Sequence, residues 1–200
     1  MIKKASCLIV SMLFCITSLI AADKSAISSA GSIIWAGIDY SQVKMIGPDF
    51  NEPDAIFPGM LVKWNNLFLK ERITRLKSNL DKEIIPDVEG TGSVNKNASA
   101  GQITVVPGPD DVIDKTHITD EIIADQVKKY KMISKSGIAL VLIADRFIKV
   151  DNKGIGAVYV VYFDVETRKV LKSKREINGA GGFGFRNFWF RVIKETSVKI

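Results

Sequence analysis

The feature that most constrains the fold is a pair of long apolar runs in the last third of the chain, over residues 138–150 and 157–165. Each run suits a strand buried on both faces, and the turn-forming residues 151–154 lie between them. A third run over 170–177 is more polar and basic, as is typical of an edge strand. The pattern predicts a three-stranded antiparallel meander over 138–177.

Helical spacing of apolar residues occurs in three other places, and each predicts an amphipathic helix that packs on the sheet. The first is residues 60–80, where Leu61, Trp64 and Phe68 share one face. The second begins at Thr119, a good N-cap that precedes two acidic residues. The third closes the chain, with apolar residues at 185, 188, 189, 192 and 193.

Shorter apolar runs predict further strands at 33–46, 84–88 and 103–106, the first of them bent or bulged near Gly37. The predicted fold class is α+β: a mixed sheet that ends in the antiparallel meander and is packed by about three amphipathic helices. Proline-rich residues 48–59 and the polar, glycine-rich residues 89–102 are expected to be loops, the second of them mobile.

The N-terminus has the layout of a secretory signal peptide, with Lys3 and Lys4 before an apolar core and Ala21 and Ala22 at its end. We expect residues 1–22 to be removed, 23–32 to be a flexible lead-in, and 33–200 to form a single domain. The protein would then be periplasmic or secreted, with no transmembrane segment after cleavage. A lipoprotein signal at Cys15 is the alternative, although Phe14 is bulky where lipid-modifying enzymes prefer a small residue.

Both cysteines, Cys7 and Cys15, lie inside the predicted signal. The mature chain would therefore have no disulfide, no thiolate metal site and no cysteine nucleophile, and only its core would stabilise it.

Charge is unevenly distributed along the chain. Residues 23–127 carry 10 basic and 16 acidic side chains, whereas residues 128–200 carry 16 basic and 6 acidic ones. A basic face in the last third could attract an anionic lipid, a glycan or an acidic envelope protein, and nucleic acid is not an expected partner. Its candidate residues are Lys172, Lys174, Arg175 and Arg186.

Residues 179–184 formally spell GxGxxG between a strand and a helix. A dinucleotide site would need a βαβ unit, and only 16 residues follow Gly184, so we expect a glycine-rich turn instead. Its backbone amides, with Arg186 and Asn187, could form a small anion- or partner-binding nest. Phe183 and Phe190 fall off the apolar stripe of the last helix and are predicted to be exposed anchors for a partner.

No residue pattern predicts a cofactor or a metal ion. His117 is the only histidine and is expected at the surface or in a capping role, and Asp110, Asp111 and Asp114 lack the alternation of a calcium loop. Asp39 and Asp145 are the acids most expected to be buried, each beside a partner on a neighbouring strand. They are the candidates if the chain is a carboxylate-based hydrolase.

Residues 162–171, followed by the segment 179–187, resemble the C-terminal signature of an uncharacterised family of small secreted bacterial proteins. More loosely, the order of elements resembles periplasmic domains of the TolB N-terminal and LpoB type, which implies envelope protein contacts by fold-level analogy. The sequence thus predicts an exported, non-enzymatic interaction domain of the bacterial cell envelope. The alternatives are a hydrolase acting on glycan or envelope substrates, or a binder of anionic lipid or glycan.

Overall fold

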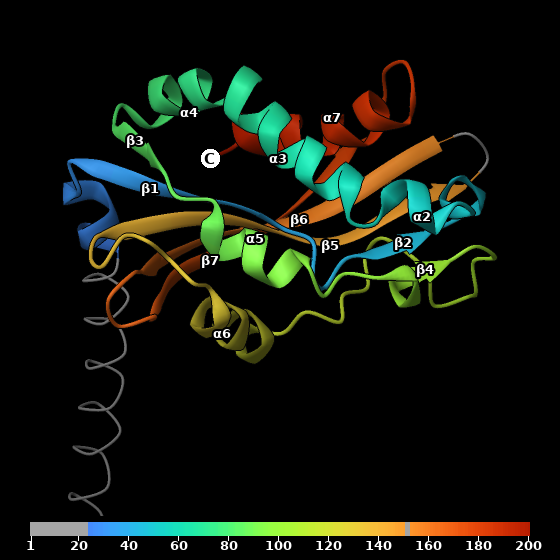
Figure 1. Ribbon diagram of the computed structural model, residues 1–200, viewed down its shortest axis with the longest axis horizontal. Helices are drawn as coiled ribbons and strands as arrows, with labels where there is room; N and C mark the ends of the chain where they lie inside the picture. The colour runs from blue at the N-terminus through green and yellow to red at the C-terminus, as the bar shows by residue number, and fades with distance from the viewer. Residues whose placement is uncertain (1–23, 151–152) are drawn as a thin grey trace, which may run out of the picture.

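The computed structural model describes residues 24–150 and 153–200, and the predicted signal peptide lies outside these ranges. A single seven-stranded sheet runs through the molecule, and helices cover both of its faces (Figure 1). The fold is therefore built from mixed helices and strands, as the sequence predicts.

The longest strand, β5 (Ile138–Val150), organises the sheet. On one side it pairs in parallel with two strands in succession, first β1 (Ser32–Asp39) and then β2 (Lys44–Ile46). Two short strands complete this side, because β3 (Glu83–Pro86) pairs in parallel with β1 and β4 (Ile103–Thr104) pairs in parallel with β2.

On its other side β5 pairs with β6 (Lys153–Asp164), which pairs in turn with β7 (Val170–Gly179), and both pairings are antiparallel. These strands span the predicted 138–177 region. The prediction stated no direction for the remaining pairings, and all of them are parallel.

Alternation along β5 creates two separate cores. Leu140 and Leu142 face a layer made by α3 (Gly59–Glu71), α4 (Ile73–Leu80) and α7 (Phe185–Val198). Ala139 and Val141 face the opposite layer, made by α5 (Glu89–Asn95) and α6 (Asp120–Lys129). Figure 1 shows the two layers on opposite sides of the sheet.

Several boundaries differ from the expectations. The predicted 33–46 strand is divided, because residues 40–43 turn the chain from β1 to β2, and the predicted 60–80 helix is interrupted at Arg72 between α3 and α4. The 48–59 segment contains two short helices, Pro48–Phe50 and α2 (Pro53–Ile56). Residues 24–29 of the predicted flexible lead-in are helical, and Ser32 already belongs to β1.

The largest correction concerns residues 89–102, which were expected to be a mobile loop. They form α5 and the short 3-10 helix Ala100–Gln102. Gly90, Thr91, Val94 and Asn95 are buried, because one face of α5 packs on β1 and on the segment that follows α6. Tertiary packing therefore overrides the low helix propensity of this glycine-rich sequence.

Candidate functional site

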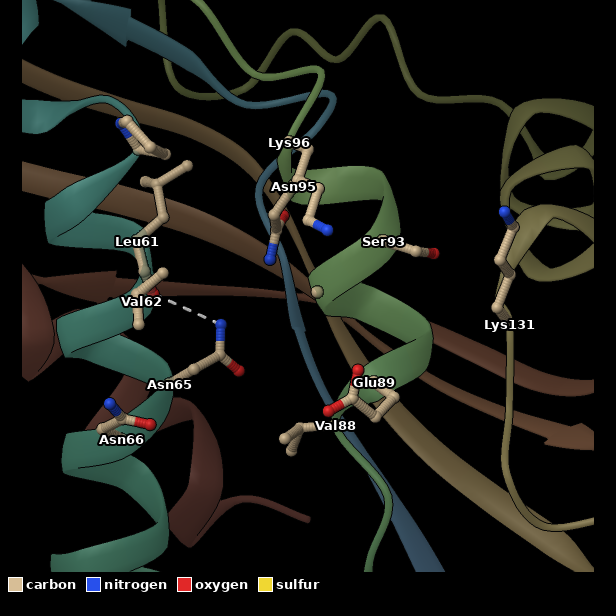
Figure 2. Close-up of a pocket in the computed structure, with 12 residues that line it drawn as sticks. Leu61, Val62, Asn65, Asn66, Val88, Glu89, Ser93, Asn95, Lys96 and Lys131 are labelled. Carbon is tan, nitrogen blue, oxygen red and sulfur yellow. Dashed lines mark hydrogen bonds between the residues drawn. The ribbon is translucent and has the colours of Figure 1, made fainter.

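A groove lies where the two helical layers meet at the edge of the sheet, between α3 and α5 (Figure 2). It arises because β3 ends at Pro86, while β1 continues to Asp39. Over these last residues β1 pairs with β5 on one side, and no strand of the described chain pairs with it on the other side. The volume of the groove is about 540 Å³, which lies in the range of small-ligand sites.

Side-chain amides close the open edge of β1. The Asn65 amide, from α3, accepts a hydrogen bond from the backbone N–H of Ile38 at 2.8 Å and donates to its carbonyl at 3.1 Å. The Asn95 amide, from α5, accepts from the N–H of Tyr40 at 2.6 Å and donates to the Ile38 carbonyl at 2.8 Å. These two side chains replace the peptide groups of a missing strand, so the floor of the groove is fixed.

The third contact at this edge is a hydroxyl. Thr91 donates from Oγ1 to the Ala36 carbonyl at 2.7 Å, beside the β-bulge at Gly37. A Cβ atom on Gly37 would lie 2.5 Å from Thr91 Oγ1 and 2.9 Å from Asn65 Oδ1, and Gly37 has a φ of +95°. The bulge predicted near this glycine is confirmed, and the helices approach β1 closely because Gly37 has no side chain.

The rim of the groove offers different chemistry from its floor. Leu61 and Val62 of α3 and Val88 are its apolar lining residues (Figure 2). Nothing lies within 4 Å of a Cβ on Gly92 of α5, which also lines the groove. The floor amides are already engaged, so a ligand in the groove would meet mainly apolar surface there.

Charged side chains stand around this apolar surface. Glu89, Lys96 and Lys131 line the groove, and within residues 24–150 and 153–200 they form no side-chain hydrogen bond or ion pair with one another or with a neighbour. The groove therefore combines apolar walls with charges of both signs that remain able to bind a ligand.

The buried acids lie on the opposite face of the sheet from α3. Asp39 accepts hydrogen bonds from the Tyr130 hydroxyl at 2.8 Å and from the N–H of Ser41 at 2.7 Å. Burial raises the pKa of Asp39, and the bonds from Ser41 and Tyr130 together with the charge of Lys129 offset this effect only in part.

Replacing Asp39 tests this balance. A raised pKa means that the folded protein favours the neutral acid. The stability that Asp39 contributes is therefore lost as the pH rises from the ordinary pKa of an aspartate through the raised pKa of Asp39 in the folded protein. We expect Asp39→Asn to gain free energy of unfolding relative to the parent as pH rises from 4 to 8, measured by urea denaturation. The exposed control Asp54→Asn should show no such trend, and a parallel pH profile for Asp39→Asn and the parent would contradict the assignment.

Asp145 is the centre of a second polar cluster. Arg175 donates to its Oδ2 from Nε at 2.7 Å, and His117 Nδ1 lies 3.4 Å from its Oδ1. Burial alone would raise the pKa of Asp145, but the hydrogen bonds from His117 and Arg175 and the charge of Arg175 outweigh it and bring the pKa below its usual value.

The same cluster fastens the long irregular segment between β4 and α6. The guanidinium of Arg146 donates to the Val112 carbonyl at 2.7 Å, and Arg175 donates to the Ile113 carbonyl at 2.7 Å. His117 Nε2 bonds the Gln42 carbonyl at 2.9 Å, which makes Nε2 the donor. His117, expected at the surface or in a capping role, is partly exposed and has a structural role, because its two ring nitrogens join the segment to Gln42 and Asp145.

The predicted anchors and basic residues do not form one site. Phe183 is 96% exposed, but Phe190 is only 4% exposed and packs in the core, so its assignment as an exposed anchor is wrong. Lys172 and Lys174 lie on one face of β7, whereas Arg175 lies on the other face, bound to Asp145.

Other predicted residues have local roles. Arg186 donates to its neighbour Asn187 at 3.1 Å at the start of α7, after a turn in which Gly182 and Gly184 have positive φ values. Asp110 pairs with Lys115, and the residues that the structure describes contain no cluster that could hold a metal ion. In the same part of the chain, none of the helices has the length and apolar character needed to cross a membrane.

Sequence reasoning missed the α3–α5 groove. Its floor depends on Asn65, which belongs to the predicted 60–80 helix, and on Asn95, which belongs to α5, a segment that was expected to be a loop. One sequence feature could have indicated α5: Thr91 and Asn95 are four residues apart, and residues at this spacing lie on one face of a helix.

Comparison of the chain with protein-family models, with curated proteins and with solved structures found no match. The functional assignment is therefore based on the geometry of the groove and of the buried clusters.

Proposed function

We propose that the chain is an exported, non-enzymatic binding domain of the bacterial cell envelope, and that it holds a ligand in the groove between α3 and α5. The observation that carries this proposal is the preformed floor, in which Asn65, Thr91 and Asn95 fix the edge of β1 beneath an open, charged rim. A preorganised site binds without the entropic cost of ordering loops. Export is inferred from the residues 1–22 pattern.

Binding is favoured over catalysis because of where the acids lie. Asp39 and Asp145, the candidates for a hydrolase, are both fully buried, and each is held by partners inside the protein. Neither carboxylate lines the groove. A catalytic carboxylate must reach the bond that it cleaves, so this arrangement gives the hydrolase alternative no support.

The basic-surface alternative has weaker support than the groove. Lys174 pairs with Glu176, and Arg175 is engaged with Asp145, so two of its four predicted residues are neutralised within the protein. Lys172 lies over the ring of Tyr162 at 5.9 Å. Envelope protein contact through exposed Phe183 is compatible with a groove ligand, since the two surfaces use different elements.

A panel of small probes tests the proposal. NMR spectra of the ¹⁵N-labelled protein would be recorded with amino acids, short peptides, sugars, fatty acids and inorganic phosphate. We expect at least one class of probe to shift amide signals of α3 and α5. Gly92→Trp should abolish these shifts by filling the groove, because nothing lies within 4 Å of a Cβ at this position.

Gly31→Trp is the matched control, since Gly31 is equally open but lies outside the groove. It should leave the shifts unchanged. The proposal is overturned if no probe shifts the α3 and α5 signals, or if the shifts survive in Gly92→Trp.

A further inference from the structure

The strand β7 lies at one border of the sheet and has one open side. It pairs with β6, and no other strand of residues 24–150 and 153–200 pairs with it. β7 has 10 residues, which is long for an edge strand, and such an edge presents unpaired N–H and C=O groups to other chains. This border differs from the edge of β1, which the Asn65 and Asn95 amides close.

The register shows which backbone groups of β7 point outward. Ala180 donates from its N–H to the Gly154 carbonyl at 2.8 Å, one step beyond the pair of Ile155 with Gly179. Hydrogen-bonded pairs alternate along an antiparallel ladder, so every second residue of β7 bonds to β6 and the residues between them direct their N–H and C=O groups away from it. The outward residues in the middle of the strand are Ser173, Arg175 and Ile177.

These outward groups have almost no partners inside the protein. The Ile177 carbonyl accepts a hydrogen bond from Lys199 Nζ at 3.3 Å, and within the described residues no other hydrogen bond reaches the outward backbone groups of Ser173, Arg175 and Ile177. The Lys199 side chain is 45% exposed, so it can turn away from this carbonyl. The edge therefore offers a row of donors and acceptors to one further strand.

The side chains between the outward residues carry opposite charges. Lys174 and Glu176 lie on the same face of β7 and form an ion pair, and Glu176 also lies 3.4 Å from Lys199 Nζ. Lysines on an edge strand usually oppose pairing with another chain. Here an acid follows the lysine at a spacing of two residues, so a copy of the strand that runs in the opposite direction can meet each charge with its opposite.

We propose that a second copy of this chain pairs with β7 in antiparallel orientation, about a two-fold axis at Arg175. In this register Lys174 of each copy lies opposite Glu176 of the other, at non-hydrogen-bonded positions, where opposing side chains are closest. Ser173 of each copy lies opposite Ile177 of the other, and their outward N–H and C=O groups bond to each other. The two sheets join into one, through a surface separate from the groove between α3 and α5.

The charge pattern favours this register over its neighbours. An axis at Lys174 would set that lysine opposite itself, and an axis at Glu176 would set two carboxylates opposite each other. In the proposed register Arg175 meets its own copy, but its charge is already neutralised by Asp145, to which it donates at 2.7 Å on the other face of the sheet.

An acidic strand from a different protein is the alternative occupant of this edge. Its carboxylates would gain from Lys172 and Lys174 but would also face Glu176. A second copy of β7 matches charges of both signs, so the observations favour it.

Two charge reversals test the register. Lys174→Glu would set carboxylates opposite each other in both symmetric pairs, and Glu176→Lys would set ammonium groups opposite each other, so we expect each variant alone to dimerise about 10-fold more weakly than the parent. An equal mixture of the two variants has opposite charges in both pairs and should regain the affinity of the parent. Sedimentation equilibrium from about 1 µM to 1 mM covers the range expected for a small interface.

Lys63→Glu and Glu71→Lys are the matched controls, because they make the same charge changes at exposed positions of α3. They should leave dimerisation unchanged, alone and mixed. Ser173→Pro tests the backbone separately: it removes an outward N–H and no bond to β6, so the variant should be folded by circular dichroism and monomeric. Lys174→Pro removes an N–H that points to β6 and should lower the midpoint of thermal unfolding.

Hydrogen exchange locates the interface. Dimer formation should slow exchange of the Ser173, Arg175 and Ile177 amides, whereas the alternate amides are already bonded to β6. The proposal is overturned if the parent is monomeric up to about 1 mM, or if the mixed charge variants dimerise no better than either alone. Protection of the outward amides by the peptide Glu-Val-Glu-Val-Glu in a chain that stays monomeric would assign the edge to a different protein and would also overturn it.

Discussion

Asp145→Ala is expected to lower the free energy of unfolding by about 3–5 kcal/mol, because it leaves the charged partners of a buried ion pair without a counter-charge. Arg175 would lose both of its bonds to the carboxylate, and His117 would face an empty space. Guanidinium denaturation at pH 7 measures the loss. In the same variant, the segment between β4 and α6 should detach from the sheet, and hydrogen exchange would show this as faster exchange of the backbone amides around Ile113.

The pH dependence provides an independent check. The pKa of Asp145 is lowered in the folded state. Its contribution to the free energy of unfolding is therefore fully present above the unfolded pKa of about 3.9, and it is lost as the pH falls through the pKa of the folded state. The difference in stability between the parent and Asp145→Asn should therefore shrink in acid. Asp110→Ala removes an exposed ion pair and should leave stability essentially unchanged. Equal losses in both alanine variants would refute the role given to Asp145.

Gly37→Ala is expected to destabilise the protein by about 3 kcal/mol. A left-handed φ costs alanine about 1–2 kcal/mol, and crowding in a packed region costs about 1–3 kcal/mol. The new methyl group would push against Thr91 and Asn65, which together hold the edge of β1. Thermal unfolding measures the stability change, and NMR would show altered signals across α3 and α5.

Gly92→Ala is the matched control for this substitution. Gly92 lies in α5, has open space where a Cβ would be, and does not have a positive φ. Alanine in a helix is favoured over glycine by about 0.5–1 kcal/mol, so this variant should be equally or more stable than the parent. A Gly37→Ala protein as stable as the Gly92→Ala protein would show that the close approach at β1 is not required.

The elements with strong periodicity were predictable from the sequence. The run over 138–150 corresponds to β5, Thr119 caps α6 through a hydrogen bond from the Ile122 N–H, and Trp189 and Ile193 lie on the buried face of α7. In each of these, local propensity, polarity pattern and tertiary packing agree. The burial of Asp39 and Asp145 could be predicted for the same reason, since both follow apolar residues within strands.

Elements that depend on long-range contacts were not predictable. α5 contains Gly90 and Gly92 and has little intrinsic tendency to form a helix, and it is held in place by the bonds of Thr91 and Asn95 to a strand more than 50 residues earlier. The separation of β1 from β2 likewise depends on their successive pairing with one long strand. The groove follows from both features, so the sequence alone could not locate it.

The closure of the β1 edge by side chains has a consequence for behaviour at high concentration. An open edge of a sheet attracts strands from other molecules, which leads to aggregation. Here the backbone groups of Ile38 and Tyr40 are already bonded to two asparagine amides. Because the helices α3 and α5 that carry these amides also cover the edge, a foreign strand could pair with β1 there only if the two helices moved away from it.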